Sequence, residues 1–409
     1  MRQVTVVGLG YMGLPTALLL ARAGRWDIVG QDIAADRVAS LVRGDLPFSE
    51  PGLRELFDAA RSRFRAVDAL EPSDAFILTL PTPVDERHRC DLSALEEAVD
   101  NLGRVVRDGD LVIVESTVAP GTTVRLRERL RRDSGKDVRF AYVAEKAIPG
   151  NTLAEMVGND RIIGLIDAAA REPTALLYGS FVRGELLFTD ATTAEAVKLF
   201  ENTFRDVNIA LANEFSDLAE EHGIDAYEAI ALANRHPRVN ILSPGPGVGG
   251  HCIAVDPWFL VQDVEAGELV RASRRINDAR PEAVVERVTQ HAPVGCKVAV
   301  LGAAYKANVD DVRESPSLVI AEHLRARGFR VAMHDPFART AGVSGDLGEV
   351  LAGAGCVVLA TDHAAYAELD LDRIAPPAAI IVDTRGLWRD RAIAPARYVL
   401  LGGRGRGAG

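Results

Sequence analysis

A glycine-rich stretch near the middle of the chain, residues 245–257, contains the residue types best suited to chemistry. It reads Gly-Pro-Gly-Val-Gly-Gly-His-Cys-Ile-Ala-Val-Asp-Pro, so it places an imidazole at His251, a thiol at Cys252 and a carboxylate at Asp256. Glycines lack Cβ atoms, which lets backbone and ligand approach closely. A thiol near a carboxylate suits covalent catalysis on an aldehyde. Free cysteines are also common as small buried hydrophobes, so the loop alone leaves both interpretations open.

The N-terminal residues predict a dinucleotide site. An apolar strand at residues 4–7 leads into Gly8, Gly10 and Gly13, spaced as in the G-x-G-x-x-G fingerprint, and a helical pattern follows. A second strand ends at Asp32, where a carboxylate accepts hydrogen bonds from a ribose and repels a 2′-phosphate. The predicted cofactor is therefore NAD. The residues expected to contact it are Gly8, Gly10, Tyr11, Met12, Gly13, Asp32, Arg37, Thr82, Ser116 and Thr117.

Strand and helix patterns alternate in both the first and the last third of the chain. Strands are expected at residues 75–80, 111–115 and 138–143, and later at 297–301, 330–334, 356–360 and 379–383. Such alternation predicts parallel sheets covered by helices on both faces, with ligands at the carboxyl ends of the strands. The later strands lack the full glycine fingerprint, so no second dinucleotide is expected.

A long helix is predicted between these two parts. Thr192 and Glu195 have the spacing of a capping box, and the helical pattern continues to about His222 with Gly223 as its stop. The sequence thus predicts an α/β protein with two Rossmann-like parallel-sheet domains joined by a central all-helical domain. The expected domains are an NAD-binding domain at 1–190, a helical domain with the cysteine loop at 191–290, and a substrate domain at 291–409.

The predicted long helix has polar residues in its interior. Lys198, Asn202 and Arg205 are spaced to share one face. Asparagine is a poor helix former, so its presence at Asn202, Asn208 and Asn213 indicates a specific partner for at least one of them. A helix this long also predicts a homodimer surface.

Composition limits the classes of function. A net charge of −11 over 409 residues argues against a general nucleic-acid binder. The four cysteines are widely spaced, which predicts a reducing, cytoplasmic compartment and neither disulfides nor a metal site. No apolar run has membrane-spanning length, and the strand pattern starts too early for a signal peptide.

Several motifs occur in the order found in one family. They are the stretches at 8–13, 48–53 (Phe-Ser-Glu-Pro-Gly-Leu), 81–83 (Pro-Thr-Pro) and 116–118 (Ser-Thr-Val), then Lys198, Asn202, Asn213 and Glu214, the cysteine loop, Tyr305, Lys306, Asp310, Asp311, and 313–316 (Arg-Glu-Ser-Pro). Together they resemble the nucleotide-sugar dehydrogenases of the UDP-glucose/GDP-mannose dehydrogenase family. That resemblance implies oxidation of a UDP-hexose at C6 to a uronic acid with two NAD.

The resemblance also implies catalytic roles. Cys252 becomes the nucleophile that forms a thiohemiacetal and then a thioester. Lys198 and Asn202 stabilise oxyanions, and Asp256 acts as base. Glu145 is a second candidate for activating the hydrolytic water, and Thr117 orients it. Two neighbours of Glu145 depart from the family pattern, because Ala144 stands where proline is usual and Lys146 where arginine is frequent.

The resemblance further implies a set of substrate contacts. They are Glu145, Lys198, Asn202, Arg205, Arg238, Asn240, Gly249, His251, Tyr305, Lys306, Arg313 and Arg385. His251 directly before the cysteine resembles the branch that acts on UDP-N-acetylmannosamine. UDP-glucose and UDP-N-acetylglucosamine are alternative substrates. A two-electron hydroxyacid dehydrogenase of the 6-phosphogluconate type and a catalytically inactive nucleotide-sugar binder are more remote alternatives.

Overall fold

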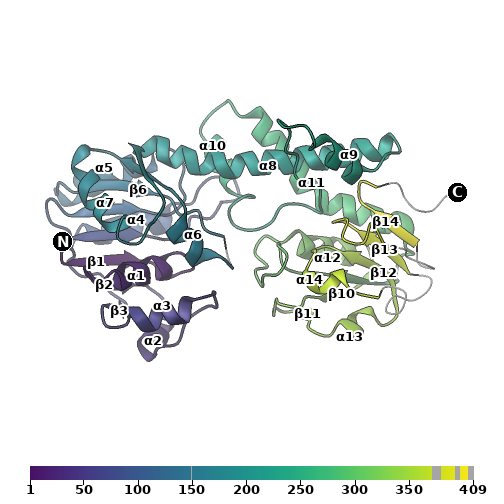
Figure 1. Cartoon of the computed structure of the whole chain (residues 1–409), viewed down its shortest axis with the longest axis horizontal. Coiled ribbons are helices and arrows are strands. Elements are labelled where there is room, and N and C mark those ends of the chain that lie inside the picture. The colour runs from purple at the N-terminus through teal and green to yellow at the C-terminus, as the bar shows by residue number, and fades with distance from the viewer. Residues whose placement is uncertain (149, 371–378, 392–396, 404–409) are drawn as a thin grey trace. The chain divides into compact units, whose positions relative to one another are not determined.

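A computed structural model describes residues 1–148, 150–370, 379–391 and 397–403 (Figure 1). The chain divides into two compact units. Unit 1 comprises Met1–Glu201 and Trp258–Asp263, and unit 2 comprises Asn202–Pro257 and Val264–Gly409. The longest helix, α8 (Ala191–Glu221), begins in unit 1 and ends in unit 2. The three-domain boundaries expected from the sequence stay a prediction.

Unit 1 is built on an eight-stranded sheet with the order β3-β2-β1-β4-β5-β6-β7-β8. Its strands are β1 (Gln3–Val7), β2 (Asp27–Gln31), β3 (Phe64–Val67), β4 (Ala75–Leu78), β5 (Leu111–Val114), β6 (Arg139–Val143), β7 (Arg161–Leu165) and β8 (Leu186–Asp190). Its helices are α1 (Gly13–Arg22), α2 (Ala35–Arg43), α3 (Leu53–Ala60), α4 (Ser93–Leu102), α5 (Thr122–Ser134), α6 (Thr152–Gly158) and α7 (Arg171–Tyr178), with a 3₁₀ turn η1 (Ala168–Ala170).

The central strands of this sheet are apolar on both faces. In β4, Ile77 packs into a core with α1 and α3, while its neighbours Phe76 and Leu78 pack into a second core with α4 and α5. Burial on both faces is the reason that these strands read as continuous apolar runs. The strands predicted at 75–80, 111–115 and 138–143 are confirmed within a few residues.

The expectation of a purely parallel sheet is wrong at one place. Strands β6 and β7 pair antiparallel, whereas the other neighbouring strands of this sheet pair parallel. The chain passes through the short helix α6 between these strands and enters β7 from the edge at which it left β6.

Unit 2 contains a six-stranded, all-parallel sheet with the order β11-β10-β9-β12-β13-β14. Its strands are β9 (Lys297–Leu301), β10 (Arg330–His334), β11 (Val343–Ser344), β12 (Ala354–Leu359), β13 (Ile380–Asp383) and β14 (Arg397–Leu400). Helices of this unit are α9 (Ala226–Ala233), α11 (Glu268–His291), α12 (Pro316–Ala326), α13 (Leu347–Leu351) and α14 (Ala364–Ala367), and α10 (Asp256–Val261) begins here. The predicted architecture of two Rossmann-like sheets and a helical region with one long helix is confirmed.

Helix α8 buries several polar side chains and exposes several large apolar ones. The buried positions are Glu195, Lys198, Asn202, Thr203, Asp206, Asn213 and Ser216, and the exposed ones include Phe200, Phe204, Leu211, Phe215 and Leu218. The usual amphipathic helix has the reverse arrangement. Arg205 is on the same side of the continuous helix as Lys198 and Asn202, as the spacing predicts, but its side chain is exposed whereas theirs are buried. Among the described residues, no helix is long and apolar enough to cross a membrane.

The predicted capping box at the start of α8 is also wrong. The carboxylate of Asp190 accepts hydrogen bonds from the backbone N–H of Thr193 (2.9 Å) and from its hydroxyl (2.6 Å), so Asp190 caps the helix. Glu195 faces inward and accepts from the N–H groups of Gly121 (2.5 Å) and Thr123 (2.7 Å) at the start of α5. The glutamate is therefore used in tertiary packing, which sequence spacing does not reveal.

Two of the three helix asparagines have buried partners, as expected. The side-chain amide of Asn213 donates to Asn277 of α11 (2.9 Å), and its oxygen accepts from the N–H of Gly245 (2.9 Å). Asn277 in turn donates to Asp206 (2.8 Å), which is also paired with Arg274 (2.5 Å). Hydrogen bonds of this kind offset the cost of burying polar groups. This network fixes α11 and the first glycine of the cysteine loop on α8.

Candidate active site

In the glycine turn of unit 1, two glycines leave no room for a side chain and the third does. Gly8 has a φ of +94°, and a Cβ on Gly13 would strike the carbonyl of Gly8 and the hydroxyl of Thr79. A Cβ on Gly10 would meet no atom within 4 Å. The turn thus needs Gly8 and Gly13 for its own geometry, and at Gly10 it leaves backbone accessible to a ligand. This pattern fits a pyrophosphate beside the N-terminus of α1.

Asp32 stands at the carboxyl end of β2, where the sequence places it. Its carboxylate accepts hydrogen bonds from the N–H of Leu9 (2.8 Å) and of Ala34 (2.9 Å), and it pairs with Arg37 (2.7 Å). The residues expected to hold NAD therefore meet at one edge of the sheet. Tyr11 joins them by stacking on Phe48, with ring centroids 4.3 Å apart.

The hydroxyl residues at the ends of β4 and β5 bond to backbone. Ser116 donates to the carbonyl of Leu80 (2.7 Å), and Thr82 donates to the carbonyl of Thr117 (2.7 Å). These bonds tie the two strand ends together. The predicted cofactor contacts of Thr82, Ser116 and Thr117 stay a prediction.

Glu145 belongs to a buried charge cluster that the sequence did not indicate. Its carboxylate accepts from Arg161 (3.1 Å), the first residue of β7, and from the N–H of Ala147. Glu115 lies in the same cluster and accepts from Thr16 (3.1 Å) and from the hydroxyl of Tyr178 (3.2 Å). Burial raises the pKa of Glu115 to about 7, although the charge of Arg161 opposes the shift. The position of Glu115 after a buried strand was the only signal in the sequence.

The cysteine loop of unit 2 is a tight turn that leads into α10. The carbonyl of Cys252 accepts from the N–H of Val255 (3.0 Å) and from that of Asp256 (2.8 Å), so the thiol residue and the carboxylate residue share one turn. The amide of Asn202 donates to the carboxylate of Asp256 at 2.6 Å, and both side chains are buried. The structure thus brings together three of the predicted catalytic residues. Lys198 lies on the same helix one turn before Asn202 and is also buried.

Glycines let this loop lie directly on the segment after β9. A Cβ on Gly249 would overlap Tyr305 and Pro316, and one on Gly250 would press on the ring of Tyr305. The N–H of Gly250 donates to the carbonyl of Arg313 (3.0 Å). The absence of side chains therefore serves close packing between the cysteine loop and the Rossmann-like sheet of the same unit.

Arg313 supplies a cation beside the cysteine loop. Hydrogen bonds with Asp311 (2.6 Å) raise the pKa of Arg313, burial opposes this, and an electrostatic interaction with Cys252 adds to the increase. Burial opposes ionisation of Asp311, but Arg313 and the nearby His251 lower the pKa of its carboxyl.

Four further predicted substrate contacts lie in unit 2. Arg385 pairs with Asp362 (3.1 Å), and its guanidinium lies where a side chain on Gly245 would be. Lys306 is exposed on the loop after β9, and Arg238 and Asn240 are exposed after α9. Their contacts to substrate, like the other assigned roles, stay predictions.

A unit with a G-x-G-x-x-G turn, joined to a Rossmann-like unit that carries a cysteine loop, defines the protein as an NAD-dependent dehydrogenase. Three models of one family match it: the NAD binding domain of the UDP-glucose/GDP-mannose dehydrogenase family at residues 2–182, the central domain at 192–279 and the UDP binding domain at 299–390. The chain belongs to this family, and its cofactor is NAD.

Similar proteins cover nearly the whole chain. UDP-N-acetyl-D-mannosamine dehydrogenase of Methanocaldococcus jannaschii is 42% identical, with 94% of this chain and 92% of that protein covered. NDP-N-acetyl-D-galactosaminuronic acid dehydrogenase of Ralstonia nicotianae is also 42% identical, with 96% and 98% covered. The solved structure of the UDP-D-ManNAc dehydrogenase from Pyrococcus horikoshii matches with a TM-score of 0.93 at 38% identity, covering 99% of this chain and 100% of that one.

The glycine turn generates a matched pair of substitutions. Gly13→Ala places a methyl group against the Gly8 carbonyl and should lower the free energy of unfolding by about 1–3 kcal/mol. Gly10→Ala meets no protein atom and should change stability by less than about 0.5 kcal/mol while weakening NAD binding. Urea unfolding and calorimetric titration with NAD measure the two effects. Equal loss of stability in both variants would contradict this assignment.

The buried carboxyl of Glu115 predicts a pH dependence of stability. Because its pKa is raised from 4.5 to about 7, the folded protein keeps a proton that the unfolded chain releases, so stability falls as pH rises through this window. The full effect is about 3 kcal/mol. Glu115→Gln should reduce the loss of unfolding free energy between pH 5 and pH 8. The exposed Glu97→Gln serves as control, and an unchanged pH dependence in Glu115→Gln would refute the prediction.

Proposed function

We propose that this protein oxidises the C6 hydroxymethyl group of UDP-N-acetyl-D-mannosamine to the carboxylate with NAD, in two steps of two electrons each. The observation that carries the proposal is the turn in which Cys252 and Asp256 are held together, with Asn202 bonded to Asp256 and Arg313 beside the thiol. A single alcohol oxidation needs no thiol nucleophile. A four-electron oxidation does, because an aldehyde must become tetrahedral before it can release a second hydride.

The chain's own residues would divide this chemistry among them. NAD, when bound at the glycine turn of unit 1, accepts hydride. Asp256 takes the proton of the substrate hydroxyl, and the amide of Asn202 holds its carboxylate in place. Cys252 then attacks the aldehyde carbon as thiolate to give a thiohemiacetal, and oxidation converts it into a thioester. Water hydrolyses the thioester and releases the carboxylate product and the free thiol.

Charged and amide groups on α8 would stabilise the oxyanions. Lys198 supplies a cation, and Asn202 is the second donor assigned by family resemblance; loss of one such donor typically costs about 3 kcal/mol in the barrier. Asp256 also activates the hydrolytic water. Glu145 and Thr117 remain candidates for positioning that water, although Glu145 is already paired with Arg161.

The sugar is assigned from sequence likeness. His251 before the cysteine resembles the N-acetylmannosamine branch, and the relative from Methanocaldococcus jannaschii bears that name. The equally identical relative from Ralstonia nicotianae is named for an N-acetylgalactosamine-derived sugar, so the configuration of the hexose is the point to test. We also propose that the protein is cytoplasmic, as the widely spaced cysteines predict.

The proposal predicts a stoichiometry and a decisive variant. The wild-type protein should form two NADH for each UDP-N-acetyl-D-mannosamine consumed, and should form NADH more slowly with UDP-glucose or UDP-N-acetylglucosamine under the same conditions. Cys252→Ala should lower release of the uronic acid by more than about 10³-fold, because no covalent intermediate forms. Cys90→Ala, at a half-buried thiol in unit 1, is the control. Near wild-type release of acid by Cys252→Ala would rule out the covalent route.

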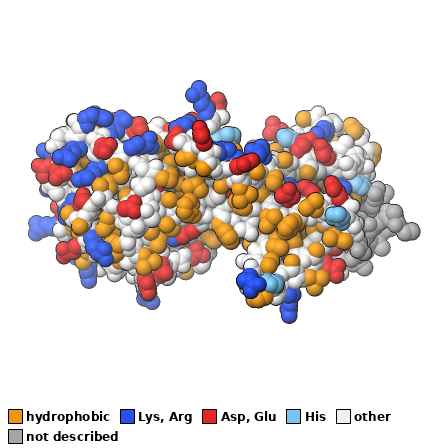
Figure 2. Space-filling view, turned by 90° about the horizontal axis from the view of Figure 1, so that it is seen from above, with side chains coloured by type: hydrophobic (Ala, Val, Ile, Leu, Met, Phe, Trp, Pro, Cys, Tyr) orange, Lys and Arg blue, Asp and Glu red, His pale blue; other side chains and the backbone are white. Residues whose placement is uncertain are grey.

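We further propose that the protein is a homodimer formed through its helical region. Figure 2 shows hydrophobic side chains gathered on the face that carries α8. Phe204 is 63% exposed and Leu218 is 45% exposed. Farther along, Phe215, Leu218 and Ile230 line an apolar pocket of about 260 Å³ with other residues of α8 and α9. Contiguous exposed apolar surface of this kind is typical of protein interfaces.

The dimer is tested by mass in solution. Light scattering after size exclusion should give twice the mass of one chain. Phe204→Asp and Leu218→Asp together should yield the monomer, because two charges cannot be buried unpaired in an apolar interface. Val294→Asp, which changes an equally exposed apolar residue outside α8, should leave the dimer intact. A wild-type monomer at micromolar concentration would remove this proposal.

A further inference from the structure

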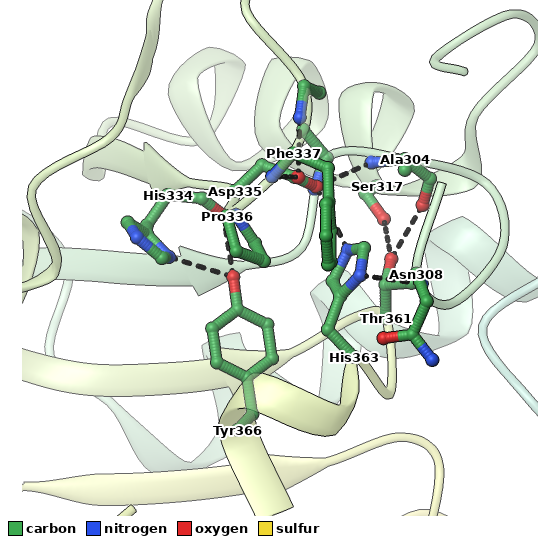
Figure 3. A network of polar contacts seen from close by, with 12 residues as sticks. Ala304, Asn308, Ser317, His334, Asp335, Pro336, Phe337, Thr361, His363 and Tyr366 are labelled. Atoms are coloured by element: carbon green, nitrogen blue, oxygen red, sulfur yellow. Dashed lines mark hydrogen bonds and ion pairs between the residues drawn. The ribbon is translucent and has the colours of Figure 1, made fainter. Parts of the chain in front are cut away.

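A fully buried carboxylate organises the end of the sheet in unit 2. Asp335 follows β10 directly and accepts from the N–H groups of Ala303 (2.7 Å), Ala304 (2.9 Å), Phe337 (2.8 Å) and Ala338 (2.8 Å). A fifth bond joins it to Nε2 of His363 (3.0 Å; Figure 3). Five donors occupy the acceptor capacity of a carboxylate. Asp335 therefore binds protein groups and offers no oxygen to a ligand.

The bonds of His363 define one tautomer. Its Nδ1 accepts from the backbone N–H of Asn308 (2.9 Å), so the proton must reside on Nε2, which donates to Asp335. The imidazole is fully buried between the rings of Phe337 and Tyr366, with centroids 5.3 Å and 5.5 Å away. Both nitrogens and both ring faces of His363 are thus in use.

The pair holds both ends of one short loop. Ala304 is fixed by Asp335, and its carbonyl accepts from the hydroxyl of Thr361 (2.6 Å). At the other end, Asn308 has a φ of +62°, donates its N–H to His363, and accepts from the N–H of Ala364 (2.9 Å) through its side-chain oxygen. A left-handed backbone is unfavourable for a residue with a side chain and persists when surrounding bonds fix it.

The residues inside this loop are those that face the cysteine loop and the solvent. Tyr305 packs against Gly249 and Gly250, where any Cβ would collide with it, and Lys306 is exposed. Neither side chain belongs to the Asp335–His363 pair. The pair therefore holds both ends of the loop that carries Tyr305 and Lys306, and the N–H of Tyr305 in that loop donates to the carbonyl of Asp311 (3.0 Å).

We propose that Asp335 and His363 are positioning residues for nucleotide-sugar binding, because they clamp the loop at 303–308 and so present Tyr305 and Lys306 to the UDP part of the substrate. This inference rests on the proposed function, in which the loop after β9 contacts the substrate. It predicts that the bond from Asn308 to His363 controls the affinity for the nucleotide, because that bond holds one end of the loop.

Two substitutions separate the two bonds of His363. In His363→Gln the side-chain amide reaches the place of Nε2, so it can donate to Asp335 but leaves the N–H of Asn308 without its acceptor. In His363→Asn the side-chain oxygen takes the place of Nδ1, so it can accept from Asn308 but leaves Asp335 one donor short. His334→Asn is the matched control, since His334 is buried in the same network and bonds Tyr366 (2.8 Å), not the loop.

The two variants of His363 should differ in KM. Both lose the buried ring and should unfold below the wild-type temperature, but His363→Gln should also raise the KM for the UDP-sugar about fivefold, with kcat and the KM for NAD unchanged. His363→Asn and His334→Asn should keep the wild-type KM. A merely structural role would move KM and unfolding temperature together. An unchanged KM in His363→Gln, or a KM that follows stability across the three variants, would overturn the inference.

Binding of UDP alone distinguishes this inference from the proposed function. Calorimetric titration with UDP needs no turnover, and His363→Gln should bind UDP about fivefold more weakly than wild type. If the wild-type protein binds UDP but reduces no NAD with any UDP-sugar, the proposed function fails and the affinity ratio still decides the role of His363. Equal UDP affinity of wild type and His363→Gln would contradict the positioning role.

Discussion

The polar side chains that α8 buries are the constraint on which the rest of the molecule depends. A helix that turns carboxylates and amides inward must give each of them a partner, because a buried unpaired polar group is costly. In unit 1, Glu195 accepts hydrogen bonds from two backbone N–H groups at the start of α5. In unit 2, Asn213 bonds both α11 and the cysteine loop, and Asn202 bonds Asp256. The same helix thus bonds both the scaffold and the cysteine loop with its α10 start, and several of its large apolar side chains are left exposed.

The cysteine loop is held by backbone as much as by side chains. Its own turn brings Cys252 and Asp256 together, and the N–H of Gly250 bonds the carbonyl of Arg313. Glycines then permit contact with Tyr305, whose loop is in turn clamped through Asp335 and His363. A nucleophile needs a fixed position relative to the atoms it attacks. In unit 2, Asp335 and His363 bond the two ends of one loop, and Tyr305 in that loop contacts the glycines beside Cys252.

The aspartate that follows the second strand has different surroundings in the two sheets. Asp32 and Asp335 each follow the second strand of a parallel sheet, and each accepts from the N–H groups after the first strand. Asp32 pairs with a half-exposed arginine at an open glycine turn, whereas Asp335 is saturated by buried donors. This explains in physical terms why the fingerprint of the first sheet binds a dinucleotide and the second sheet reads as degenerate.

The sequence by itself determined the central strands of both sheets, the long helix, the family and the cofactor. Buried strands are visible as continuous apolar runs, and the turn is visible in the spacing of Gly8, Gly10 and Gly13. The local pattern of residues is therefore enough to predict these features. Tertiary structure alone decided the antiparallel β7, the true cap Asp190, the inward face of Glu195, and the bonds of Arg161, Asp335 and His363. Those features depend on partners far along the chain, and no local spacing encodes which buried polar groups will meet.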